Sequence, residues 1–239
     1  MSEFFWGPLA RIDMDGVFVF KIATYVILLI SLTFHEYGHA WSAKKLGDDT
    51  AESMGRLTLN PLVHIDPIFT VLVPLMFLFG PGAGSGFMFG AAKPVPVNPL
   101  YLRKPTRDMM LTSAAGPGMN VVLAFFFTAA YWFHVVVRGV PWDNLSSLMI
   151  KSAIELNLIL AVFNLLPIPP LDGHRVLGFF LPSNLRENFY RLGTGAGFVL
   201  LLILMFTGIL GRIMSPILVT IGQWWGALMP EGLHLFYRP

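Results

Sequence analysis

The sequence of 239 residues contains no cysteine and few charged residues, since Asp, Glu, Lys and Arg make up only 13% of it. Without cysteine there is neither a disulfide framework nor a thiolate zinc site, so any metal ligands must be histidine or carboxylate side chains. The net charge of +2 at pH 7 is too small to predict binding to nucleic acid. No cleavable signal peptide is expected, because the first apolar run continues directly into a polar motif.

Apolar residues, by contrast, are abundant. They make up 55% of the chain, and the mean hydropathy is +0.65. These values predict an integral membrane protein with a single domain over residues 1–239, made of a core at 17–180 and accessory C-terminal helices at 192–230. The expected fold class is an all-α polytopic membrane protein, a bundle of about five to six transmembrane helices with short membrane-associated β segments.

The predicted spans follow from runs that are long enough to cross about 30 Å of hydrocarbon. The first covers residues 17–46, the second 109–137 and the third 152–166, and two further apolar runs cover 192–211 and 213–230. Arg212 separates the last two runs. Within the third span, Glu155 is expected to pair with Lys151 one helical turn earlier.

Other stretches do not read as ordinary spans. Residues 67–82 are apolar but short, and they can either cross the membrane or re-enter it. Residues 55–60 alternate in polarity as a strand does, and residues 87–97 contain prolines that favour extended backbone. We therefore expect β segments at 55–60 and 87–97, at a sheet edge that can accept another chain.

The most informative motif is HExxH at residues 35–39, inside the first span. On a helix, His35 and His39 lie one turn apart on the same face, so both imidazoles can reach one zinc ion. Zinc lowers the pKa of a bound water to near neutrality, and Glu36 stands beside it as a candidate general base. Ionisable groups are costly within a bilayer and usually have a function there, so the motif predicts metal-dependent hydrolysis.

A catalytic zinc site needs a third protein ligand. Four side chains are candidates: Asp66, Asp172, His64 and His174. Asp172 is favoured because it follows a proline-broken helix end at the same expected depth as His39. A turn-forming Asp-Gly pair is the alternative for Asp172. His64 can line the mouth of the site or bond at the membrane interface. His174 can bind an inhibitory group or support a metal ligand, but it is more simply a surface histidine.

Three motifs occur here in the order and context of one known family. HEYGH at 35–39, AGPGMN at 115–120 and NLLPIPPLDG at 164–173 resemble the site-2 protease family of intramembrane zinc metalloproteases. The resemblance covers roughly residues 25–180 and fits the compact prokaryotic branch, which has no PDZ or CBS domain. The joint occurrence of the three motifs is much more specific than HExxH alone.

This resemblance implies roles for five residues. His35, His39 and Asp172 would bind one zinc ion per chain, Glu36 would be the general base, and Asn164 would steady the substrate or its tetrahedral intermediate. The implied activity is that of a zinc metalloendopeptidase, which hydrolyses peptide bonds in or near transmembrane segments of protein substrates within the lipid bilayer. A regulatory or complex-forming membrane partner also fits this family.

The basic residues predict the topology. Residues 44–107 contain seven Lys and Arg, more than the other connections, so the positive-inside rule places this stretch in the cytoplasm. We thus expect a multi-pass protein of the plasma or inner membrane whose active site faces the cytoplasmic side. One alternative function is a non-proteolytic zinc-binding subunit or scaffold of a larger complex. A metal transporter is a weaker one, because the spans carry few charges away from one end.

Overall fold

The computed structural model describes residues 13–79, 90–191, 195–229 and 235. Its elements in chain order are α2 (Met14–Leu46), α3 (Thr50–Ser53), η2 (Pro61–Val63), η3 (Pro67–Leu72), α4 (Val73–Phe79), α5 (Pro105–Trp132), η4 (Phe133–Val137), α6 (Leu145–Asn164), α7 (Asp172–Phe180), α8 (Ser183–Arg191), α9 (Ala196–Phe206) and α10 (Ile209–Gly226).

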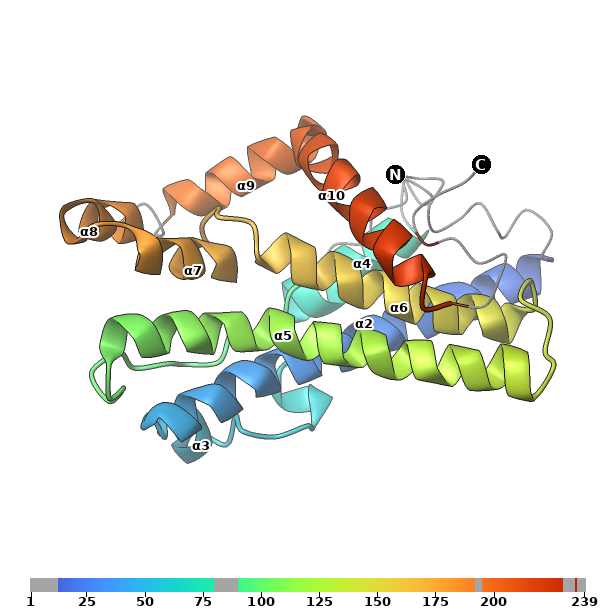
Figure 1. The fold of residues 1–239 in the computed structure, drawn as a ribbon, viewed down its shortest axis with the longest axis horizontal. Helices are drawn as coiled ribbons and strands as arrows, with labels where there is room; N and C mark the ends of the chain where they lie inside the picture. The colour runs from blue at the N-terminus through green and yellow to red at the C-terminus, as the bar shows by residue number, and fades with distance from the viewer. Residues whose placement is uncertain (1–12, 80–89, 192–194, 230–234, 236–239) are drawn as a thin grey trace.

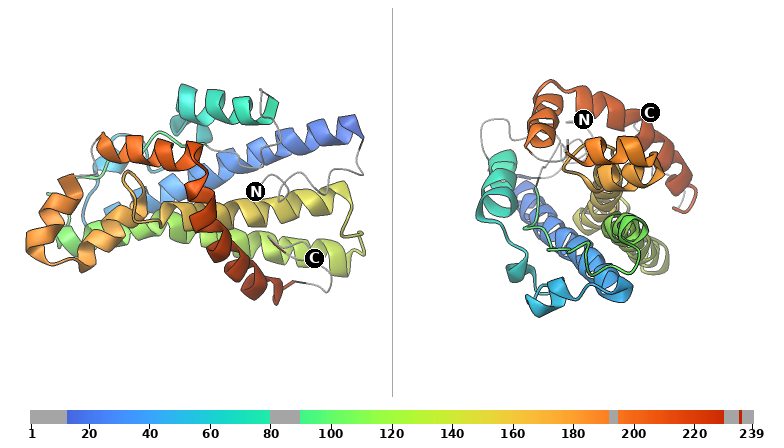
Figure 2. Two further views of the ribbon diagram at one scale, coloured as in Figure 1. Left: turned by 90° about the horizontal axis from the view of Figure 1, so that it is seen from above. Right: turned by 90° about the vertical axis from the view of Figure 1, so that its left-hand side faces the viewer.

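Three long helices, α2, α5 and α6, form the centre of the molecule, and α5 packs against both of the others (Figures 1 and 2). The side chain of Asp13 caps the start of α2 by accepting a hydrogen bond from the Gly16 amide at 2.9 Å. Gly47 ends this helix with a φ of 112°, a left-handed conformation that favours glycine. At Gly38, α2 approaches α5 so closely that an added Cβ would lie 2.7 Å from the Ala115 carbonyl oxygen.

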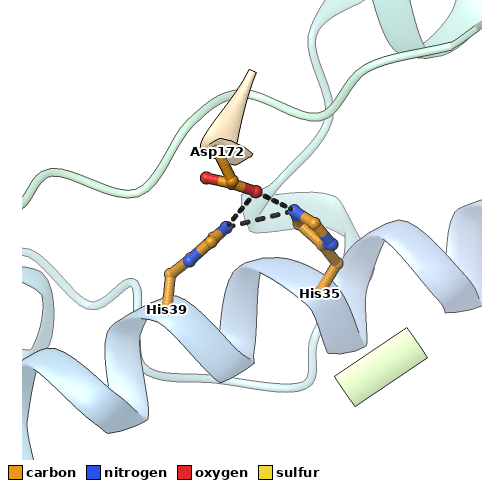
Figure 3. A group of neighbouring side chains, drawn as sticks. All are labelled: His35, His39 and Asp172. Carbon is orange, nitrogen blue, oxygen red and sulfur yellow. Dashed lines mark hydrogen bonds and ion pairs between the residues drawn. The ribbon is translucent and has the colours of Figure 1, made fainter. Parts of the chain in front are cut away.

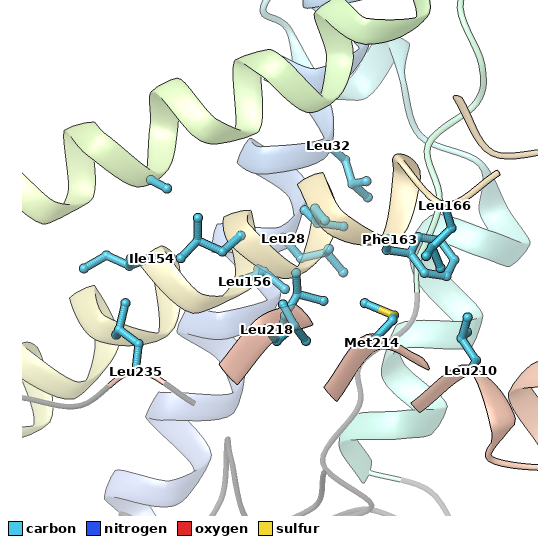
Figure 4. Packing of buried hydrophobic residues seen from close by; sticks show 14 of the residues in the cluster. Leu28, Leu32, Ile154, Leu156, Phe163, Leu166, Leu210, Met214, Leu218 and Leu235 are labelled. Atoms are coloured by element: carbon cyan, nitrogen blue, oxygen red, sulfur yellow. The ribbon is translucent and has the colours of Figure 1, made fainter. Parts of the chain in front are cut away.

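The main hydrophobic core lies around α6 and extends to α10, which packs against it (Figure 4). Ile154 and Leu156 of α6 are almost fully buried, as are Leu28 of α2 and Met214 of α10. Many large apolar side chains on the outer surfaces of α2 and α5 are exposed, as expected for helices that face lipid. The α6 helix is thus the buried element around which the site is assembled.

The predicted number of spans was too high. Within the described residues, three helical stretches are long and apolar enough to cross a membrane: α2, α5 continued by η4, and α6. A fourth is obtained if α9 and α10, which meet at an angle of 79°, count as one broken span. This break lies at Gly208, with a φ of 72°, and Arg212 lies inside α10. The predicted boundary at Arg212 was therefore wrong.

The predicted β segments are also wrong for the part of the chain that the structure describes, which contains no strand. Arg56 is buried, and its guanidinium donates to the carbonyl oxygens of Val63 and Pro94, which a partner strand would otherwise satisfy. Residues 90–98 have no assigned secondary structure, and Pro94 and Pro96 have no amide to donate to a neighbouring strand. Residues 87–89 of the second expected segment lie outside the described residues.

Candidate metal centre

The two histidines of the HExxH motif point to the same side of α2 and meet an aspartate from a distant part of the chain (Figure 3). Their Nε2 atoms are 3.0 Å apart. Asp172 Oδ2 lies 3.2 Å from Nε2 of His35 and 3.3 Å from Nε2 of His39. The structure therefore brings together the three side chains that the resemblance implies as ligands.

A close turn after α6 carries Asp172 to this position. Asp172 is the first residue of α7, and the chain reaches it through a proline-rich connection in which the Leu171 amide bonds to the Ile168 carbonyl at 2.9 Å. Gly173 packs directly on the backbone of Leu165 at the end of α6, where no Cβ has room. Burial alone would raise the pKa of Asp172, but the charge and hydrogen bonds of His39 and His35 hold this pKa well below its usual range.

Each imidazole is also held from behind, through its Nδ1 atom. His35 Nδ1 lies 2.6 Å from Oδ1 of Asn120, and His39 Nδ1 lies 2.7 Å from the backbone carbonyl oxygen of Thr112. A carbonyl oxygen can only accept a hydrogen bond, so His39 carries a proton on Nδ1 and leaves Nε2 free as a ligand. Both partners lie on α5, which explains why this helix packs so closely against α2.

The three donor atoms fit zinc. Zinc bonds of about 2.0–2.1 Å in a tetrahedron place neighbouring ligand atoms about 3.3–3.4 Å apart, close to the separations observed here. Gly116 lies against the Cε1 edges of both rings, and an added Cβ there would come within 2.8 Å of His35 Cε1 and even closer to Nε2 and Cε1 of His39. The residue types, their spacing and the space left by Gly116 agree with a three-ligand metal centre.

The group opens into a cavity of about 370 Å³ with a largely apolar lining. Glu36 lines this cavity with only 8% of its surface exposed, and its Oε2 accepts a hydrogen bond of 2.8 Å from the Val95 amide. Asn164 lines it too, oriented by a bond of 2.9 Å from Nδ2 to the Leu160 carbonyl. Arg175, three residues beyond Asp172, lies between this cavity and a second one of about 410 Å³.

The other candidate ligands have different roles. Asp66 caps η3 by accepting hydrogen bonds from the amides of Ile68 and Phe69. His64 is buried away from both cavities and bonds to the Thr58 carbonyl at 2.9 Å.

His174 is buried and bonds through Nε2 to the Phe189 carbonyl at 2.8 Å, so its interpretation as a surface histidine was wrong. Burial lowers the pKa of His174 from its usual value, the Phe189 bond opposes that effect, and Arg175 adds to it. The expected pair of Lys151 with Glu155 is confirmed at 3.2 Å.

Sequence reasoning missed the residues that hold the histidines. Asn120 entered only as part of the motif at 115–120, and Asn157 received no role. The available signal was their position, because an amide inside a long apolar span must find hydrogen-bond partners there. Thr112 could not have been found in this way, because its contribution to His39 is a backbone carbonyl.

Comparison with known proteins agrees with the fold and the site. The sequence profile of peptidase family M50 matches residues 23–146 and 141–204. The chain is 37% identical over 199 residues to YwhC of Bacillus subtilis, named as a candidate zinc metalloprotease, covering 81% of this chain and 84% of YwhC.

Two further relatives extend this similarity. Rip2 of Mycolicibacterium smegmatis, also named as a candidate zinc metalloprotease, is 34% identical over 223 residues, which cover 86% of this chain and 77% of Rip2. The zinc metalloprotease MJ0392 of Methanocaldococcus jannaschii is 25% identical over 213 residues, or 87% of this chain and 49% of its own length. No solved structure matches the chain.

A helical membrane protein with a His, His, Asp group beside a buried glutamate defines the class as membrane metallopeptidase. The chain belongs to peptidase family M50. The family resemblance that the three motifs indicated is thereby confirmed.

Proposed function

We propose that this chain is a zinc metalloendopeptidase that hydrolyses peptide bonds in or near transmembrane segments of membrane-protein substrates. His35, His39 and Asp172 would hold one zinc ion. The observation that carries this proposal is the placement of three ligand atoms at tetrahedral separations in the same cavity as the Glu36 carboxylate. The names of two relatives as zinc metalloproteases also support it.

Zinc, when bound, would polarise the scissile carbonyl and acidify a water molecule. Glu36 would accept the proton of that water and pass it to the departing amine, as a general base and then a general acid. The hydrogen bond from the Val95 amide fixes the direction of the Glu36 carboxylate toward the cavity wall. Asn164 still has an amide proton beyond the one given to Leu160, and it would donate that proton to the developing oxyanion.

The surroundings suit a membrane-embedded substrate. A transmembrane helix hides its carbonyl groups in its own hydrogen bonds, so a cleavable segment must unwind before it can reach these residues. The cavity offers apolar walls for its side chains, and the His35, His39 and Asp172 group lies in the same cavity. We further propose, from the distribution of Lys and Arg, that the site opens toward the cytoplasmic face of the plasma or inner membrane.

The test compares Glu36→Gln with wild-type protein purified in detergent and reconstituted with a membrane-protein substrate. We expect Glu36→Gln to retain one zinc ion per chain by elemental analysis and to lose cleavage. A matched control is Glu52→Gln, which changes an exposed glutamate paired with Lys44 and should leave cleavage unchanged. Cleavage by Glu36→Gln at the wild-type rate would contradict the mechanism. Zinc binding without cleavage by the wild type would instead favour a non-proteolytic subunit.

A further inference from the structure

Behind His35 lies a group of polar side chains that no solvent reaches. Asn120 of α5, Asn157 of α6 and Ser31 of α2 each have 0% exposure. They stand at the junction of the three central helices, on the side of His35 opposite the cavity. Buried amides are costly unless every donor and acceptor is paired, so the hydrogen bonds here determine which way each amide points.

The orientation of Asn157 follows from a backbone carbonyl. One end of its side-chain amide lies 2.8 Å from the Ala153 carbonyl oxygen and 3.0 Å from Ser31 Oγ. Because a carbonyl oxygen can only accept, this end must be the NH₂ group. The oxygen of Asn157 must therefore face the other way, toward Asn120.

The orientation of Asn120 follows in turn. The end of its amide that faces Asn157 lies 3.0 Å from Asn157 Oδ1 and 3.3 Å from the Ser31 carbonyl oxygen. Both neighbours are acceptors, so this end must also be NH₂. The oxygen of Asn120 is left to face His35 Nδ1, at 2.6 Å.

We propose that Asn157 is a positioning residue for the metal centre, which acts through Asn120 to keep a proton on Nδ1 of His35 and so presents Nε2 as the ligand atom. The direction of the hydrogen bonds starts from the Ala153 carbonyl, which fixes the orientation of the Asn157 amide. Asn157 in turn orients the Asn120 amide, so each amide has only one orientation in which its hydrogen bonds are satisfied. The hydrogen bond partner of the non-ligating nitrogen is what fixes the tautomer of a metal-binding histidine.

His39 also carries its proton on Nδ1, but a direct hydrogen bond to a backbone carbonyl keeps it there. His39 Nδ1 faces the Thr112 carbonyl directly and needs no intermediate side chain. His35 has no such carbonyl at hand, since its Nδ1 faces a side-chain amide that could in principle turn over. The Ser31 carbonyl oxygen, 3.3 Å from the Asn120 amide, favours one orientation, and Asn157 at the shorter distance of 3.0 Å reinforces it. This gives a buried asparagine in α6 a role that simple helix packing does not require.

The inference rests on the proposed zinc site and is tested with Asn157→Leu, which keeps the number and branching of the non-hydrogen side-chain atoms and removes both hydrogen-bonding ends. We expect its zinc affinity, measured by competition with a chelating dye, to fall about 10–100-fold. Nitrogen NMR of histidine-labelled protein should show His35 Nδ1 protonated in the wild type, and a mixture of tautomers in Asn157→Leu. Ser31→Ala leaves the Ala153 carbonyl in place and should lose less affinity than Asn157→Leu.

The matched control is Thr128→Val, which removes a partly buried hydrogen bond between helices, from Trp225 Nε1 to Thr128 Oγ1 at 2.8 Å. It should reduce thermal stability without changing zinc affinity or the His35 signal. An Asn157→Leu protein with wild-type affinity and an unchanged signal would overturn the inference. If that variant does not fold, the wild-type spectrum decides, because an unprotonated Nδ1 on His35 would overturn it equally. A wild type that binds no zinc would instead contradict the proposed function.

Discussion

The two sides of the metal-binding group are built differently. Its rear side, formed by Ser31, Asn120 and Asn157 of the central helices, is fully buried and held by mutual hydrogen bonds. Its front side comes from connections between helices, namely residues 90–98 and the turn that leads to Asp172, and it borders the cavity. The rear side therefore fixes the ligands, and the front side leaves space for a peptide.

The largest effect is expected on the front side, from Asn164→Ala. Removing one donor to an oxyanion lowers kcat by about 100–1000-fold. Zinc content should stay at the wild-type level, because Asn164 lines the cavity and, among the described residues, its side-chain amide bonds to the Leu160 carbonyl and to neither histidine. Single-turnover cleavage and elemental analysis check the two parts. If zinc content and kcat fell in proportion, Asn164 would support metal binding, and the front and rear sides would not have separate functions.

Gly116 lies on α5, the helix that also carries Asn120 of the rear side, and Gly116→Ala should weaken zinc binding by up to about 100-fold, as changes to residues that support metal ligands do. The added Cβ would overlap His39 and lie 2.8 Å from His35 Cε1, which forces the rings apart. Gly118→Ala is the control, since a Cβ there meets no atom within 4 Å. Chelator competition measures both variants, and equal affinities for them would refute the close approach of α5 to the histidines.

A smaller effect, on stability, is expected at Gly173, where the turn that leads to Asp172 packs on the end of α6. Gly173→Ala places a methyl group against the Leu165 backbone and should destabilise the fold by about 1–3 kcal/mol, as overpacking usually does. Thermal unfolding in detergent tests this. Unfolding at the wild-type temperature would mean that the turn to Asp172 is looser than the structure shows.

The smallest effect is expected far from the site, for Trp225→Phe. This change removes the hydrogen bond to Thr128 but keeps a ring against Phe125, whose centroid lies 4.3 Å away. Hydrogen bonds between membrane helices average about 0.6 kcal/mol, so the unfolding temperature should fall only slightly. Zinc affinity and kcat should not change. A large loss of either would show that α10 contributes to the metal centre or to catalysis.

Much of the site could be predicted from the sequence because its residues act at fixed helical spacing. His35 and His39 share one helix face at any reasonable boundary of α2, so their approach follows from geometry alone. For Asp172, the proline-broken helix end and its expected depth favoured it as a third ligand and the family resemblance supported this role, but its distance from α2 is set by tertiary packing. The ligand roles themselves stay predictions until a metal is measured.

The fold was harder to predict in its irregular parts. Alternating polarity at 55–60 indicated a strand, but the Arg56 side chain satisfies carbonyl groups in place of a partner strand. Apolar runs near the C terminus indicated two spans, but the left-handed Gly208 bends α9 and α10 by 79°. Such outcomes depend on long-range contacts and single backbone angles, which periodicity does not encode. The single-domain division and the cytoplasmic orientation remain predictions.

X-ray absorption at the zinc edge, on purified wild-type protein and Asp172→Ala, tests the central claim most directly. We predict one zinc ion per chain whose nearest shell contains two imidazole nitrogens and a carboxylate oxygen, with weaker binding and a changed shell in Asp172→Ala. A wild-type shell without two imidazoles, or an Asp172→Ala shell identical to the wild type, would contradict the account.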